Sequence, residues 1–139
     1  MLEEGSIEQL LLTRLSKSEF KKWVDNSSAP YKELMAYYRC AIMAIETKFR
    51  ILNEELSIQY DRNPIETIKS RLKSPESIFD KITRKGCPLT VESIEENITD
   101  IAGVRVICSF PSDIYMLANA FEKQDDIHVI TRKDYISNP

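Results

Sequence analysis

A long stripe of apolar residues at helical spacing constrains the fold of this chain more than any other feature. The stripe recurs at steps of three and four residues and consists of Leu34, Tyr38, Ile42, Ile45, Phe49, Leu52 and Leu56. Because an α-helix has 3.6 residues per turn, this spacing places the stripe on one face. Turn-forming residues and Pro30 precede it, as is typical of a helix start. We predict a helix of about six turns, whose ordinary role is packing rather than chemistry.

Two capping-box patterns precede this helix. Ser6 is followed three residues later by Gln9, and Ser16 by Glu19, and each pair opens a short amphipathic stretch. The apolar residues of the two stretches are Ile7, Leu10, Leu11, Leu15, Phe20, Trp23 and Val24. We therefore expect residues 1–60 to form an N-terminal helical region.

The pattern changes after residue 60, where short strands and helices are expected. Ser74 and Pro75 are typical of an N-cap followed by proline at the first helical position. The predicted elements are a strand at 65–73, helices at 74–86 and 90–99, a β-branched strand at 103–108, a helix from Ser112, and a third strand at 127–131. The expected fold is α+β: a helical N-terminal layer, then a small mixed β-sheet with packed helices over residues 61–139.

Composition narrows the classes of function. Apolar residues make up 42% of the chain, which is enough for a core, and the net charge is −3. An acidic protein is not drawn to nucleic acid or to an anionic membrane, so we expect neither partner. Cys40, Cys87 and Cys108 form no CxxC pair, and His128 is the single histidine, so neither zinc nor a disulfide framework is indicated. With no apolar leader or membrane span apparent, a cytoplasmic location is expected.

One segment departs from this acidic background. Residues 69–85 carry six cations against two acidic residues: Lys69, Arg71, Lys73, Lys81, Arg84 and Lys85 against Glu76 and Asp80. On the predicted helix, Ser77, Lys81 and Arg84 share one face, opposite the apolar residues of the same helix. Arg71 and Lys73 share one face of the strand that leads into it. Together with the helix N-terminus, these residues could bind a polyphosphate; the alternative is that they are the solvated faces of two exposed elements.

Asp100 and Arg105 form a second candidate group. A carboxylate near a phosphate site is a hard-oxygen ligand suited to Mg²⁺, although a loop or capping role for Asp100 remains an alternative. Strict alternation would place Asp100 and Arg105 on opposite faces of a strand. Both can serve one site only if the strand starts after Asp100 or bulges at Gly103.

Three motifs in order resemble the synthetase domain of RelA/SpoT-type enzymes, which make the alarmones (p)ppGpp. They are residues 70–85, residues 100–108 (Asp-Ile-Ala-Gly-Val-Arg-Val-Ile-Cys) and residues 132–136 (Arg-Lys-Asp-Tyr-Ile). The resemblance covers roughly residues 30–139 and is most like the small, single-domain alarmone synthetases. It implies a nucleotidyltransferase-like domain and GTP pyrophosphokinase activity: the 3′-hydroxyl of GTP or GDP attacks the β-phosphorus of ATP, and AMP leaves.

The resemblance also implies roles for individual residues. Arg71 and Arg105 would stack on the two faces of adenine, and Asp100 would be the catalytic residue that binds Mg²⁺. The triphosphate would be held by Lys73, Ser77, Lys81 and Arg84.

The guanosine pocket of the family belongs to a segment after the Lys-Asp-Tyr-Ile motif, so we expect residues 1–139 to contain an ATP half-site and not to make (p)ppGpp alone. Relatives of this size often form homotetramers, so a homo-oligomer is an expected partner state. Two other readings are a non-catalytic ATP-binding regulatory module and a helical interaction domain with a basic face.

Overall fold

The structure, a computed structural model, describes residues 18, 20–22, 24 and 29–139. The predicted helix that opens at Ser6 lies outside these residues, and so does the Ser16 start of the next one; residues 18, 20–22 and 24 are helical. The chain divides into two compact units. The first comprises residues up to 42 and residues 71–103, and the second comprises residues 43–70 and 104–139.

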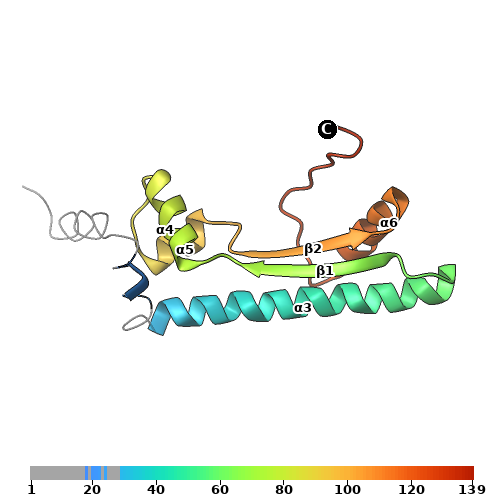
Figure 1. Cartoon of the computed structure of the whole chain (residues 1–139), viewed down its shortest axis with the longest axis horizontal. Helices are drawn as coiled ribbons and strands as arrows, with labels where there is room; N and C mark the ends of the chain where they lie inside the picture. Colours follow the sequence, from blue (N-terminus) through green and yellow to red (C-terminus); the bar gives the residue numbers. More distant parts are fainter. Residues whose placement is uncertain (1–17, 19, 23, 25–28) are drawn as a thin grey trace, which may run out of the picture. The chain divides into compact units, whose positions relative to one another are not determined.

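The predicted long helix is confirmed as α3, Ala29–Tyr60 (Figure 1). It ends at Asp61, whose φ of 53° is in the left-handed region. A short polar side chain tolerates that conformation, and the buried Pro64 that follows cannot continue a helix. No helix in the described ranges is both long enough and apolar enough to cross a lipid bilayer.

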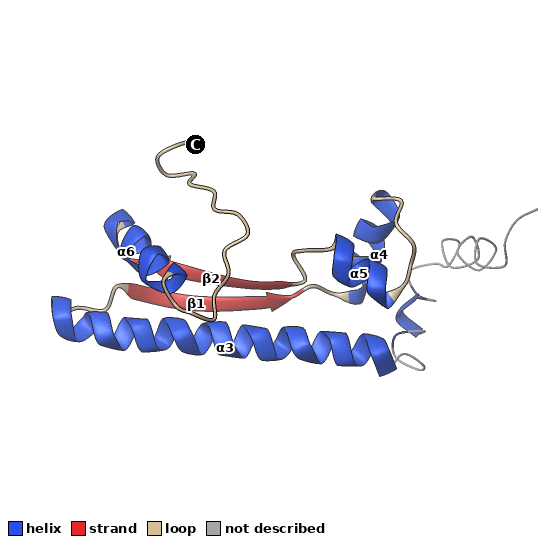
Figure 2. Ribbon diagram, turned by 180° about the vertical axis from the view of Figure 1, so that it is seen from behind, coloured by secondary structure: helices blue, strands red, loops and turns tan. Residues whose placement is uncertain are grey.

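The sheet consists of β1, Ile65–Leu72, and β2, Ala102–Cys108. The two strands lie side by side and run in opposite directions in both ribbon views (Figures 1 and 2). The predicted third strand was wrong: residues 127–131 form no strand, and Ile130 is 90% exposed. The sheet is therefore antiparallel rather than mixed. Alternating residues favour a strand, but a strand forms only where a neighbour pairs with its backbone.

The first unit is built around α4, Pro75–Arg84, and α5, Val91–Asn97. The side chains of Ser74 and Thr90 cap these helices. The cap at Ser74 was predicted from the sequence. Gly86, at φ 66°, follows the end of α4. The Gly86 N–H donates to the Thr83 carbonyl oxygen and the Cys87 N–H donates to the Ile82 carbonyl oxygen, and these two hydrogen bonds define a Schellman motif.

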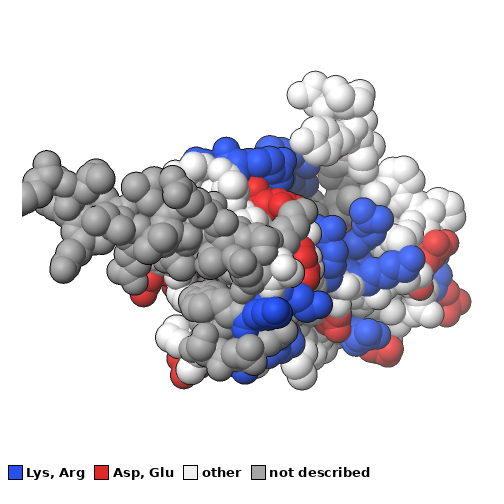
Figure 3. All heavy atoms as spheres, turned by 60° about the vertical axis from the view of Figure 1, so that its left-hand side comes forward, with Lys and Arg blue, Asp and Glu red and all other residues white. Residues whose placement is uncertain are grey.

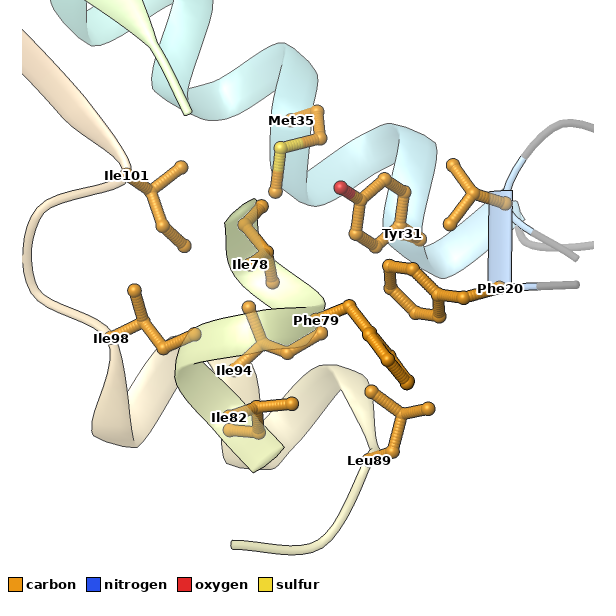
Figure 4. Packing of buried hydrophobic residues seen from close by; sticks show 11 residues of the cluster. Phe20, Tyr31, Met35, Ile78, Phe79, Ile82, Leu89, Ile94, Ile98 and Ile101 are labelled. Atoms are coloured by element: carbon orange, nitrogen blue, oxygen red, sulfur yellow. The ribbon is translucent and has the colours of Figure 1, made fainter. Parts of the chain in front are cut away.

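The core of the first unit is a single cluster of apolar side chains that point toward one another (Figure 4). Its aromatic members contact one another: the ring centroids of Phe20 and Phe79 are 5.3 Å apart with the rings tilted, and Tyr31 meets Phe20 edge-on at 6.3 Å. From α4, the cluster receives the predicted apolar face: Ile78, Phe79 and Ile82 are all buried. This burial determines which face of α4 is left for chemistry.

The second unit contains α6, Pro111–Glu122, packed on the later part of α3. The rings of Phe49 and Phe121 stack at 4.5 Å, and Leu52 and Leu117 are buried. The guanidinium of Arg62 donates two hydrogen bonds, of 2.7 and 2.5 Å, to the carboxylate of Asp113, which is 1% exposed. An ion pair thus complements a small apolar core.

Candidate nucleotide site

The candidate site is a strand–turn–helix in the first unit. Lys73 follows the end of β1, and Ser74 turns the chain into α4 with an extended backbone of φ −68° and ψ 155°. The Ser74 hydroxyl oxygen accepts the Ser77 N–H at 3.2 Å and donates to the Ser77 hydroxyl at 3.0 Å. Because Ile78 and Ile82 face the core, Lys81 is directed away from it, toward the same side as the turn.

Asp100 brings two predicted phosphate ligands together. Lys81 Nζ donates to Asp100 Oδ1 at 2.8 Å, and Lys73 Nζ donates to Asp100 Oδ2 at 3.2 Å. The segment that carries Asp100 is anchored on both sides, since Ile98 and Ile101 are each 1% exposed. A backbone hydrogen bond of 2.7 Å from the Lys73 N–H to the Ile101 carbonyl oxygen ties this segment to the turn.

These contacts keep Asp100 ionised. The hydrogen bond from Lys81 is the largest cause that lowers the pKa of Asp100, to about 2; partial burial opposes it, and the hydrogen bond from Lys73 adds to it. The carboxylate is 45% exposed, whereas the Lys73 and Lys81 side chains are 11% and 26% exposed. Two partly buried ammonium groups therefore share one charged carboxylate that remains open to solvent.

The N-terminus of α4 offers fewer free amides than its position predicts. Pro75 has no N–H, the Ser77 N–H donates to Ser74 Oγ, and the Ile78 N–H donates to the Ser74 carbonyl oxygen. Among the described residues, this leaves the Glu76 N–H for an external anion. Side-chain cations, rather than backbone amides, must supply most of the binding energy for a phosphate.

The remaining predicted cations are exposed. Arg71 is at the end of β1 and Arg84 is in the last turn of α4, and neither forms an ion pair within the described residues. Lys85, which carried no predicted role, donates to the Asn97 carbonyl oxygen at 2.8 Å. Arg105 is exposed on β2 in the second unit, so its pairing with Arg71 across adenine stays a prediction.

The strand boundary bears on Asp100. β2 starts at Ala102, so Asp100 precedes the strand and its side chain is not bound by strand alternation. Of the two expected arrangements, a strand that starts after Asp100 or one that bulges at Gly103, the structure has the first. Sequence reasoning did not identify Ser74 as a partner of Ser77; the N-cap pattern was the signal that could have done so.

Asp100 fits a metal ion that arrives with a nucleotide. Within the described ranges, no group of three or more His, Cys, Asp or Glu side chains could form a metal site by itself. Mg²⁺, however, is usually held by one or two carboxylates plus substrate phosphates. A single ionised, half-exposed carboxylate between two phosphate-binding candidates matches that requirement.

Charge at the surface is mixed rather than uniformly positive. On the face drawn in Figure 3, Lys and Arg side chains lie next to Asp and Glu side chains. Such a surface favours a compact anion at a specific group of cations over a long polyanion that follows a continuous positive stripe.

Comparison with known proteins identifies the family to which the chain belongs. Residues 70–139, half of the chain, match the family described as "Region found in RelA / SpoT proteins". The chain therefore belongs to this family, and the resemblance drawn from its three sequence motifs is confirmed.

Within the family, the chain is homologous to small alarmone synthetases. It is 46% identical over 109 residues to the GTP pyrophosphokinase YwaC of Bacillus subtilis (strain 168), covering 78% of this chain and 52% of YwaC. The crystal structure of small alarmone synthetase 2 from Bacillus subtilis matches with a TM-score of 0.66 at 45% identity, covering 78% of this chain and 54% of that one.

A second solved relative carries a nucleotide analogue. Small alarmone synthetase 1 from Bacillus subtilis bound to AMPCPP matches with a TM-score of 0.65 at 28% identity, covering 79% of this chain and 57% of that one. The chain spans about half the length of the curated relatives it matches.

Proposed function

We propose that the described strand–turn–helix binds ATP with Mg²⁺, as the ATP-binding part of a protein that transfers pyrophosphate from ATP to the 3′-hydroxyl of GTP or GDP. The observation that carries this proposal is the convergence of Lys73 and Lys81 on Asp100. The relative with AMPCPP, an analogue of ATP, supports the same class of ligand.

The proposed roles follow from the chemistry of each side chain. Lys73 and Lys81 neutralise phosphate charge, with Ser77 and Arg84 as further phosphate ligands from α4. Arg71 and Arg105 stack on adenine through their planar guanidinium groups, which lysine could not do. Asp100 is the residue that would hold Mg²⁺, which supplies charge neutralisation on the phosphates when bound.

Phosphoryl transfer depends on alignment and on neutralisation of charge that develops on the transferring group. Lys73 on the turn and Lys81 on the helix would contribute to both, because each ammonium group is positioned by a separate, anchored element. The residues assigned here concern ATP, so a guanosine-binding part is not required for the first test.

The test is a calorimetric titration of the 139-residue chain with ATP in the presence of Mg²⁺. We expect saturable binding, and we expect Arg71→Ala to weaken it by about 5- to 150-fold, the equivalent of losing one stacked base at about 1–3 kcal/mol. Arg50→Ala is the matched control, because Arg50 is also exposed and has no proposed role. Equal weakening by both variants, or no binding by the unaltered chain, would contradict the proposal.

A further inference from the structure

Asp100 has two roles that conflict with each other at the proposed site. Its carboxylate accepts hydrogen bonds from both ammonium groups that the proposed function assigns to phosphates. A phosphate chain that approaches Lys73 and Lys81 therefore meets a negative charge already bound to them.

We propose that Asp100 competes with phosphate for Lys73 and Lys81, and that Mg²⁺ relieves this competition by taking the carboxylate. This inference rests on the proposed function and adds a direction of coupling to it. In the absence of the metal ion, Asp100 opposes ATP; with the metal ion, the same residue favours ATP.

The geometry makes the competition difficult to avoid. The Lys73 side chain is 11% exposed and its segment is tied to Ile101 by a backbone hydrogen bond, so Lys73 cannot swing far from Asp100. Ile98 and Ile101 equally restrain the segment that carries Asp100. Phosphate oxygens near these lysines would thus lie close to the carboxylate, and like charges at such distances repel.

A divalent cation reverses the sign of this interaction. A carboxylate has about four acceptor positions and two of them are used by the lysines, so Asp100 retains oxygen lone pairs for a metal ion. Once the carboxylate is shared with a doubly charged cation, its net effect on a nearby polyphosphate becomes attractive. By linkage, ATP must strengthen Mg²⁺ binding by the same factor by which Mg²⁺ strengthens ATP binding.

The experiment compares ATP affinity of the unaltered chain and of Asp100→Asn, in EDTA and in Mg²⁺. We expect Asp100→Asn to bind ATP about tenfold more tightly than the unaltered chain in EDTA, because one repulsive charge is removed. In Mg²⁺ the order reverses, since the variant gains little from the metal ion. Inorganic tripolyphosphate should follow the same pattern, because the affected contacts are made to phosphates.

Glu96→Gln is the matched control, because Glu96 is an exposed carboxylate on α5 in the same unit and, among the described ion pairs, forms none with Lys73 or Lys81. It should leave both affinities unchanged, which separates local competition from net charge. Circular dichroism checks that the isosteric Asp100→Asn variant is folded. As a second measurement, Mg²⁺ must strengthen ATP binding by the unaltered chain by a factor well above one, and by a smaller factor in Asp100→Asn.

The outcomes separate the two proposals. If the unaltered chain binds ATP with Mg²⁺ but Asp100→Asn is no tighter in EDTA, the competition is refuted and the ATP site stands. If the unaltered chain binds neither ATP nor tripolyphosphate under any condition, the proposed function fails first.

Discussion

Lys81 and Lys85 lie one helical turn apart at the end of α4, yet their ammonium groups have different partners. Lys81 donates to Asp100, whereas Lys85 donates to the Asn97 carbonyl oxygen. We expect Lys81→Ala to weaken ATP binding in Mg²⁺ by about 10- to 150-fold, since a hydrogen bond to a charged group is worth about 1.5–3 kcal/mol. Calorimetry with Lys85→Ala provides a control of equal charge, and that variant should bind as the unaltered chain does.

The contrast between the two lysines shows how far spacing alone can predict a site. The periodicity of α4 correctly separates its buried face from the face that carries Ser77 and Lys81. It does not predict that Asp100, nineteen residues from Lys81, accepts hydrogen bonds from two lysines. That contact depends on how the buried side chains of Ile98 and Ile101 anchor the exposed segment between them, which is a tertiary property.

At the scale of elements, α4 and α5 begin with the same device. Ser74 caps α4 at the proposed site, and Thr90, which has no proposed role, caps α5; their side-chain oxygens accept the Ser77 and Ser93 N–H groups at 3.2 and 3.1 Å. Alanine at either cap should lower the free energy of unfolding by about 1 kcal/mol, measured by urea denaturation.

The two cap variants should differ in ligand binding. Ser74→Ala removes both hydrogen bonds to Ser77, loosens the first turn of α4 and should reduce ATP affinity. Thr90→Ala should destabilise the chain to a similar extent and leave ATP affinity unchanged. Unchanged ATP affinity in Ser74→Ala would show that the order of this turn does not contribute to the site.

The elements that sequence predicts well are those with local signals. Ser74, Pro75 and Gly86 define α4 within a few residues, because caps and a left-handed glycine act through neighbouring backbone groups. Residues 127–131 alternate as a strand would, but no described strand pairs with them. Strand formation requires a distant partner, and alternation carries no information about one.

At the scale of the whole molecule, the two units are stabilised differently. The first has a continuous apolar cluster that extends from Phe20 to Ile101. In the second, all of whose residues are described, the buried apolar side chains are Leu52, Pro64 and Leu117. The second unit therefore depends more on the pair of Arg62 with Asp113, which no local pattern could predict, because the partners are 51 residues apart.

Removal of Arg62 should expose this dependence. Arg62→Ala leaves the buried Asp113 carboxylate without its partner and also removes the stacking of the guanidinium on Phe110, at 5.0 Å. We expect the free energy of opening to fall, by less than for a fully buried pair because Arg62 is partly exposed. Amide hydrogen exchange at Leu117 measures the loss, and Arg50→Ala, on the exposed side of α3, should change little.

The effect of Arg62→Ala should also depend on pH, with a direction set by Asp113. The hydrogen bond from Arg62 is the largest cause that lowers the pKa of Asp113. A lowered pKa in the folded state stabilises the fold at pH values above the ordinary aspartate pKa of about 3.9, and this contribution is lost as the pH falls through the lowered value. The difference in Leu117 protection between the unaltered chain and Arg62→Ala should therefore be full at pH 7 and shrink in strong acid. A difference that stayed constant down to the lowest pH at which the chain is folded would mean that packing on Phe110, not the charge of Asp113, accounts for the role of Arg62.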